Sequence, residues 1–155
     1  MIGLILYDGN SLTCSRGGVT AYPDMIQLGI PSAIVAGNGS TTEAQDALAY
    51  TTVDPLPRPG AENWVVFWEG ANDLIGGATV DEAIQHLAAY CAHRRAAGWQ
   101  VMLVTLLPRS SDGTPDTYEA SRQAVNVWLR ARWADIADML VDVGADPCMG
   151  HAGQE

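Results

Sequence analysis

Residues 2–13 read Ile-Gly-Leu-Ile-Leu-Tyr-Asp-Gly-Asn-Ser-Leu-Thr, a short apolar run that passes directly into a polar turn containing glycine. A continuous apolar run of this length is typical of a strand that is buried on both faces of a parallel sheet. The turn Asp8–Thr13 follows the carboxyl end of that strand. Ligands of open α/β sheets bind beyond the carboxyl ends of the strands, so this turn is a candidate functional site.

The rest of the chain alternates between short apolar runs and longer segments with helical spacing. The further predicted strands are Ile30–Ala36, Trp64–Trp68, Val101–Leu107 and Met139–Val143. The predicted helices are Ala21–Leu28, Glu43–Thr51, Asp81–Ala97 and Thr117–Trp133. Such alternation implies right-handed crossovers between parallel strands. We therefore expect residues 1–155 to form a single α/β domain, a three-layer α/β/α sandwich whose five-stranded parallel sheet is covered on both sides.

The composition argues against several classes of partner and mechanism. The net charge of −10 leaves nothing to neutralise a nucleic-acid backbone or to bind an anionic membrane, so neither partner is expected. All eight basic side chains are arginine, which excludes phosphate loops and Schiff bases that require lysine. The three cysteines match no metal-binding or redox spacing, so they are expected to be free thiols. Neither a metal nor a cofactor is expected.

The sequence shows no targeting segment. No apolar run reaches the roughly 18 residues of a membrane span, and no basic segment precedes the first apolar run. These features predict the cytoplasm by default, although a virus-encoded or virion-associated protein would have the same profile.

Three polar turns with glycine follow the first three strands: Asp8–Thr13, Gly37–Thr42 and Glu69–Asp73. Ser11 in the first turn could be a nucleophile or the N-cap of a helix. Gly39 in the second could offer a free backbone N–H or simply permit a tight turn. Asn72 in the third could donate to an oxyanion or bond to its own backbone. Taken together, a nucleophile, a backbone N–H and a side-chain amide are the parts of an acyl-transfer site.

These turns resemble the sequence blocks of the SGNH hydrolases. Gly9-Asn10-Ser11-Leu12 is similar to the GDSL block of that family, which carries its nucleophile, and Gly39 stands in a stretch similar to the second block, whose glycine N–H donates to the oxyanion. Gly70-Ala71-Asn72-Asp73 matches the GxND block, whose asparagine is the other donor. The resemblance extends from about residue 2 to residue 147. It implies a flavodoxin-like SGNH hydrolase fold and the hydrolysis of esters, including acyl esters on lipids and carbohydrates.

Two positions depart from the family pattern. Asn10 replaces the aspartate of the GDSL block, a change expected to alter local hydrogen bonding only. The family also ends in a DxxH block that supplies the general base and the acid that orients it, and this chain lacks that spacing. The nearest equivalent is Asp146 with His151, separated by four residues instead of two. We expect the true base to be absent from this chain; the alternative is that His151, with Asp146, replaces the family pair.

Other polar residues are expected to be structural. Glu69 could orient the site, but a plain strand-end carboxylate is the simpler interpretation. The remaining histidines and most helix arginines are expected on solvated helix faces: His86, His93, Arg94, Arg95, Arg130 and Arg132.

The sequence thus predicts a serine ester hydrolase that acts on a small acyl or carbohydrate ester. The alternative is a catalytically impaired binding or structural protein on the same fold, whose base is missing or is supplied by self-association or by a partner chain. A phospho-aspartate enzyme using Asp8 is disfavoured by Asn10 and by the lack of lysine. A flavin or nucleotide site is disfavoured because Gly37-Asn38-Gly39 is too short for a dinucleotide fingerprint.

Overall fold

A computed structural model describes residues 1–14, 20–26, 28–111 and 113–150. Five parallel strands form one sheet in the order β2-β1-β3-β4-β5, as predicted. The strands are β1 (Ile2–Gly9), β2 (Ser32–Ile34), β3 (Glu62–Trp68), β4 (Gln100–Val104) and β5 (Met139–Val141). The strand order reverses between β1 and β3, because β2 lies on one side of β1 and all later strands lie on the other. In doubly wound sheets such a switch point opens a crevice at the carboxyl ends of the strands.

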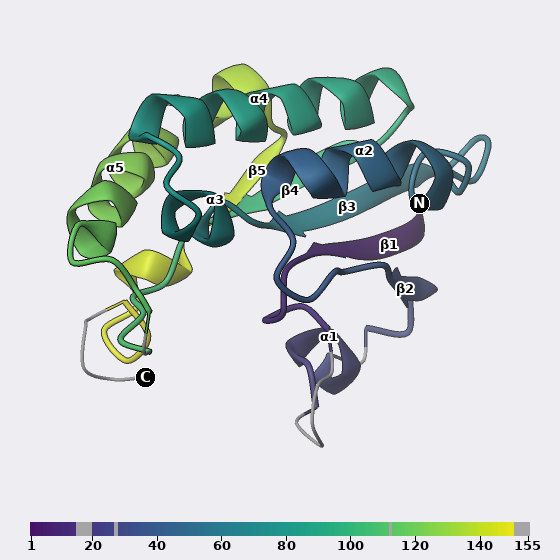
Figure 1. The fold of residues 1–155 in the computed structure, drawn as a ribbon. Coiled ribbons are helices and arrows are strands. Elements are labelled where there is room, and N and C mark those ends of the chain that lie inside the picture. The colour runs from purple at the N-terminus through teal and green to yellow at the C-terminus, as the bar shows by residue number, and fades with distance from the viewer. Residues whose placement is uncertain (15–19, 27, 112, 151–155) are drawn as a thin grey trace.

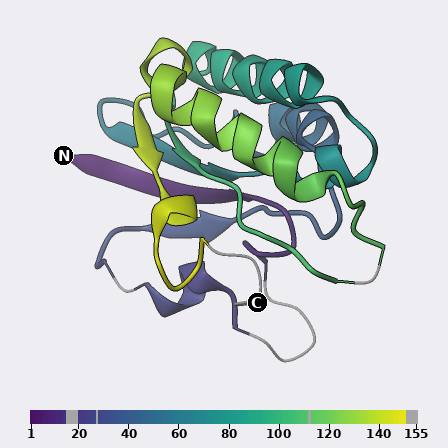
Figure 2. The same ribbon diagram turned by 90° about the vertical axis from the view of Figure 1, so that its left-hand side faces the viewer.

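The long helices lie together on one face of the sheet (Figure 1). They are α2 (Thr42–Thr52), α4 (Val80–Ala96) and α5 (Tyr118–Ile136). The five-residue α3 (Ala71–Ile75) lies between β3 and α4 in the chain. The four-residue α1 (Tyr22–Met25) lies on the opposite face (Figure 2). A short 3-10 turn, Val143–Ala145, follows β5.

Local sequence signals set the ends of two of these helices. The Thr41 hydroxyl accepts a hydrogen bond from the Ala44 N–H and caps α2. Thr79 and Glu82 form a reciprocal capping box at the start of α4. Gly98 follows α4 with a φ of +94°, a left-handed conformation that glycine adopts without strain.

Alternate residues of the strands divide the core between the two faces of the sheet. The main core lies under the long helices and includes Leu6, Val65, Phe67, Leu87 and Leu103, all of them almost fully buried. A smaller cluster on the other face is formed by Ile5, Tyr7, Val66, Trp68 and Val104.

The second face is less completely covered than the sequence predicted. Within the described residues, α1 and its neighbouring segments cover only part of it, and an apolar groove of about 920 Å³ crosses the rest. Large apolar side chains stay exposed along this groove: Leu12, Met25, Ile26, Leu28, Met139, Val141 and Met149. None of the helices in the described part of the chain has the length and apolar character needed to cross a membrane.

Candidate active site

The strand register brings the first and third predicted turns together. Gly9, the last residue of β1, is paired with Trp68, the last residue of β3. The Asn10 N–H then donates to the Trp68 carbonyl at 3.3 Å. The second turn is attached to the same edge, because the Gly37 N–H donates to the Gly9 carbonyl at 2.8 Å. The prediction that these turns meet at the carboxyl ends of the strands is confirmed.

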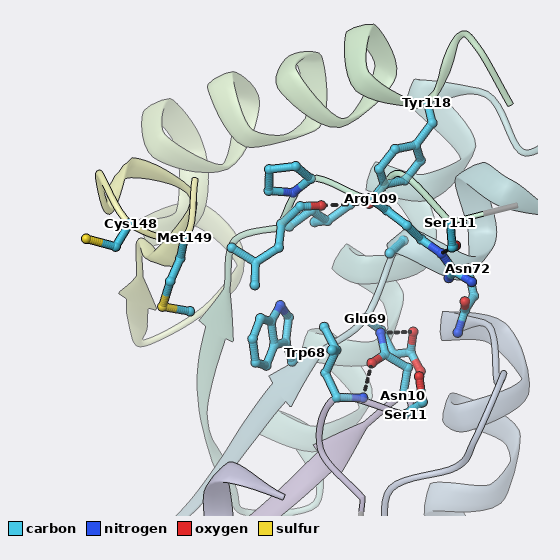
Figure 3. Close-up of a pocket in the computed structure, with 15 residues that line it drawn as sticks. Asn10, Ser11, Trp68, Glu69, Asn72, Arg109, Ser111, Tyr118, Cys148 and Met149 are labelled. Atoms are coloured by element: carbon cyan, nitrogen blue, oxygen red, sulfur yellow. Dashed lines mark hydrogen bonds between the residues drawn. The ribbon is translucent and has the colours of Figure 1, made fainter. Parts of the chain in front are cut away.

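A pocket of about 420 Å³ opens where the first and third turns meet (Figure 3). Asn10 and Ser11 line it from the first turn, and Glu69 and Asn72 line it from the third. Cys148 and Met149 reach it from the C-terminal segment, on the opposite side in the view of Figure 3. The other lining residues are Leu12, Trp68, Ala71, Leu106, Leu107, Pro108, Arg109, Ser111 and Tyr118.

Ser11 is half-buried at the edge of this pocket. Its turn is shaped by Asn10, whose side-chain oxygen accepts the Leu12 N–H at 2.9 Å and whose carbonyl accepts the Thr13 N–H at 3.0 Å. Residues 11–13 form a turn rather than the first turn of a helix. In this turn the serine side chain lines the pocket instead of capping a helix.

Asn72 lies in the first turn of α3. Although it is far from Ser11 in sequence, it lines the same pocket. Its side-chain Nδ2 donates to the Ser40 carbonyl at 2.7 Å. Because a primary amide carries two N–H bonds, this contact leaves a second donor on the same nitrogen. The sequence predicted a simple turn at Glu69–Asp73, whereas α3 begins there at Ala71, after Gly70 with a φ of +103°.

Gly39 lies in the second turn with a φ of +74°. No atom lies within 4 Å of the position where a Cβ would stand, so the backbone conformation, and not space, favours glycine here. Gly39 is not among the residues that line the pocket. Its neighbour Ser40 is linked to the pocket through Asn72 and through Glu69.

Glu69 is a functional candidate that sequence reasoning undervalued. Its side chain is only 1% exposed, and its carboxyl group contacts both other turns. The Ser40 hydroxyl lies 2.8 Å from Oε1, and Asn10 Nδ2 donates to Oε2 at 3.3 Å. Burial raises its pKa to about 8; the hydrogen-bond contacts with Ser40 and Asn10 oppose this shift, and the carboxylates of Asp73 and Asp8 add to it.

A second buried carboxyl group, Asp8, lies just beneath the first turn. It accepts hydrogen bonds from the Gly9 N–H, the Gln45 amide and the Tyr90 hydroxyl. Burial raises the pKa of Asp8 to about 6, although these three donors and the nearby Arg94 lower it. These hydrogen bonds join β1 to α2 and α4. Asp8 is not among the residues that line the pocket.

The described histidines lie away from this pocket. His86 and His93 are partly exposed on α4, and each makes a specific contact instead of being only solvated. His86 Nδ1 lies 3.0 Å from an Asp73 carboxylate oxygen, and His93 Nδ1 lies 2.8 Å from one of Asp46.

The expectation for Arg94 was wrong. Its side chain is fully buried, forms ion pairs with Asp46 and Asp54, and lies over the rings of Tyr50 and Tyr90. Its partners come from α2 and from the loop after it, so a helical pattern around residue 94 alone could not reveal its burial.

The C-terminal residues carry the predicted substitute base and acid. Asp146 is exposed, and its Oδ1 accepts the N–H groups of Cys148 at 2.7 Å and Met149 at 3.1 Å. This turn directs the chain to the pocket, since Cys148 and Met149 line it. His151 lies outside the described residues. No group of three or more metal-ligating side chains gathers within the described ranges.

Comparisons with known proteins agree with this arrangement. The profile of the GDSL-like lipase/acylhydrolase family matches residues 8–155. No curated protein matches the chain by sequence. Among solved structures, the psychrotrophic esterase EstA from Pseudoalteromonas sp., described as inhibited by monoethylphosphonate, has a TM-score of 0.75 at 15% identity, covering 94% of this chain and 80% of that one.

Two further structures have the same fold. The lipase/acylhydrolase from Enterococcus faecalis has a TM-score of 0.67 at 20% identity, with 92% of this chain and 76% of that chain covered. AlinE4, an SGNH-hydrolase family esterase, has a TM-score of 0.66 at 21% identity, with 91% and 76% covered. The chain therefore belongs to the GDSL-like lipase/acylhydrolase family, as the resemblance of its three turns predicted.

Proposed function

We propose that this chain is a serine ester hydrolase that acts through an acyl-enzyme on a small acyl or carbohydrate ester. The observation that carries the proposal is that Ser11 and Asn72, from two different turns, line one pocket of about 420 Å³. Membership of an acylhydrolase family supports the same reaction class. A pocket of this size, at the lower end of the range for small-molecule sites, supports a small substrate.

In the proposed reaction, Ser11 Oγ attacks the ester carbonyl carbon and passes its proton to the base. The carbonyl oxygen becomes an oxyanion that accepts hydrogen bonds from the second N–H of Asn72 and from the Gly39 backbone N–H. When the intermediate collapses, the ester C–O bond breaks and the alcohol leaves with the proton from the base. Water then attacks the acyl-serine in the same way, which releases the acid and restores Ser11.

We assign the base role to His151, with Asp146 as the acid that orients it. Cys148 and Met149 line the pocket of Ser11, which supports this assignment because the chain reaches the site two residues before His151. His151→Ala should then remove most of the activity. If His151→Ala leaves the rate unchanged, this chain does not use that histidine.

Hydrolysis of p-nitrophenyl acetate, with labelling by a fluorophosphonate, tests the proposal. The wild-type protein should hydrolyse the ester, and mass spectrometry should locate one phosphonyl group on Ser11. Ser11→Ala should abolish both, while Ser111→Ala, which removes another hydroxyl from the same pocket, should keep both. Labelling of Ser111, or hydrolysis that survives Ser11→Ala, would reject Ser11 as the nucleophile.

A catalytically impaired binding protein is the second candidate, and one observation favours it. Within the described residues, both histidines lie on α4, contact carboxylates and do not line the pocket. This candidate predicts that the wild-type protein binds small esters without turnover and without phosphonyl labelling.

A further inference from the structure

We propose that Glu69 is a positioning residue which, as an un-ionised carboxylic acid, holds together the three turns of the candidate active site. This proposal rests on the proposed function for its effect on rate, but the protonation of Glu69 can be measured without any turnover.

The Ser40 hydroxyl contacts two oxygen atoms but has only one proton to donate. Ser40 Oγ lies 2.8 Å from the Gly37 carbonyl oxygen and 2.8 Å from Glu69 Oε1. A serine hydroxyl has one proton, and a backbone carbonyl can only accept. In the proposed arrangement Ser40 donates to Gly37 and Glu69 donates to Ser40, whereas an ionised Glu69 would take the Ser40 proton and leave the Gly37 carbonyl without this donor. This arrangement places a proton on Glu69 Oε1 and gives both 2.8 Å contacts a donor.

The other oxygen of Glu69 fits the same arrangement. The Leu12 N–H donates to Asn10 Oδ1 at 2.9 Å, which fixes the orientation of the Asn10 amide. Its Nδ2 therefore faces Glu69 Oε2 at 3.3 Å as a donor. Oε2 acts as the carbonyl oxygen of the acid and accepts this bond, so both oxygens of Glu69 have partners.

This arrangement explains the departure at position 10. An ionised aspartate there has no proton to donate to Glu69 Oε2 and would add a negative charge beside it. Asparagine supplies a donor and no charge. Asn10 and Glu69 are therefore chemically matched, because the asparagine donates to Oε2 without adding a charge.

The surroundings of Glu69 favour the neutral form. Its side chain is 1% exposed, and two further buried carboxyl groups, Asp8 from β1 and Asp73 from α3, add negative charge nearby. Arg109, from the segment after β4, is the cationic side chain among the residues that line the same pocket. Burial, with these carboxylates, holds the pKa of Glu69 at about 8.

The position of Glu69 connects it to each part of the proposed reaction. Asn10 directly precedes Ser11, so one oxygen of Glu69 supports the nucleophile turn. The backbone carbonyl of Ser40 accepts a hydrogen bond from the Asn72 amide at 2.7 Å. Because Glu69 Oε1 contacts the Ser40 hydroxyl, this second oxygen of Glu69 supports the oxyanion donor Asn72. Ionisation of Glu69 would remove its donor to Ser40 and place a negative charge beside the developing oxyanion. Activity should therefore fall as the pH rises through the pKa of about 8.

Glu69→Gln keeps the hydrogen-bond pattern and removes the ionisable proton. The amide Nε2 can donate to Ser40, and Oε1 can accept from Asn10. We expect kcat/KM at pH 7 within about threefold of wild type, and a loss of the decline near pH 8. Glu69→Ala removes both contacts, and kcat should fall on the order of 10- to 100-fold with little change in KM, as for a displaced catalytic group. Glu62→Gln, the same change at the exposed start of β3, should leave the rate and its pH profile unchanged.

Infrared difference spectra between the wild type and Glu69→Gln provide the readout that needs no substrate. The wild type should show the carbonyl stretch of an un-ionised carboxylic acid at pH 6–7, and this band should disappear as the pH is raised above about 8. An ionised Glu69 at pH 6 would overturn the proposal, as would a folded Glu69→Gln that has lost all activity present in the wild type. If no variant hydrolyses esters, the proposed function fails, and the infrared band alone decides the state of Glu69.

Discussion

Asn72 and Ser40 are linked by a 2.7 Å hydrogen bond from a side-chain amide to a backbone carbonyl, which fixes the orientation of that amide at the pocket. The bond uses one N–H of Asn72 and directs the group that would meet an oxyanion. A donor held in this way needs no reorganisation when charge develops on the substrate.

Asn72→Ala should therefore lower kcat for p-nitrophenyl acetate by about 10²- to 10³-fold, the usual effect of removing one oxyanion donor. KM should change little, because the donor acts mainly on the transition state. Thermal unfolding of the variant serves as the control for folding. A folded Asn72→Ala protein with wild-type kcat would exclude the amide from the reaction.

Gly39→Ala tests the backbone donor of the second turn. Gly39 and Gly60 have nearly the same φ, +74° and +76°, and neither has an atom within 4 Å of its missing Cβ. Alanine at either position should lower the free energy of unfolding by roughly 1 kcal/mol through backbone strain alone. Gly60 precedes β3, at the end of the sheet away from the pocket, so only Gly39→Ala should also lower kcat. Equal kcat in the two variants would exclude the Gly39 N–H.

The parts of the site that the sequence predicted are those encoded by short local patterns. Ser11, Gly39 and Asn72 became candidates because each follows a strand, and parallel strands bring such turns to one edge; their catalytic roles stay predictions. Glu69 was undervalued because its partners, Asn10 and Ser40, are 59 and 29 residues away in sequence. The incomplete cover of the second sheet face was missed because the predicted helix Ala21–Leu28 forms only as Tyr22–Met25.

Arg94 provides a test of the core that is independent of the reaction. Its buried guanidinium has ion pairs with Asp46 and Asp54, so Arg94→Met would leave two carboxylates without their cation. Breaking a buried pair in this way should lower the free energy of unfolding by about 3–5 kcal/mol in urea titrations.

The adjacent Arg95 is the matched control. Its side chain is 44% exposed and lies 3.4 Å from Asp138. Arg95→Met should change the free energy of unfolding by less than about 1 kcal/mol. Similar losses in both variants would contradict the difference in burial between these neighbouring arginines.

The buried Asp8 should make the stability depend on pH. Its pKa is about 6 in the folded protein against an ordinary value of 3.8, so the folded state holds this proton more tightly than the unfolded chain does. The stabilisation from the proton is fully present below about pH 4 and is lost as the pH rises to about 6. Two pKa units correspond to roughly 3 kcal/mol, an order-of-magnitude figure.

Asp8→Asn removes this dependence, because asparagine keeps an acceptor for the Gly9 N–H and the Gln45 amide without a charge to bury. The free energy of unfolding of Asp8→Asn relative to wild type should therefore rise between pH 4 and pH 6 and stay level above that range. Glu69 is present in both proteins, and its pKa of about 8 lies above pH 6, so its titration contributes nearly equally to both between pH 4 and pH 6. Urea titrations at pH 4, 5, 6 and 7 measure the difference between the two proteins, and a difference that stays constant across this range would show that Asp8 does not hold its proton in the folded state.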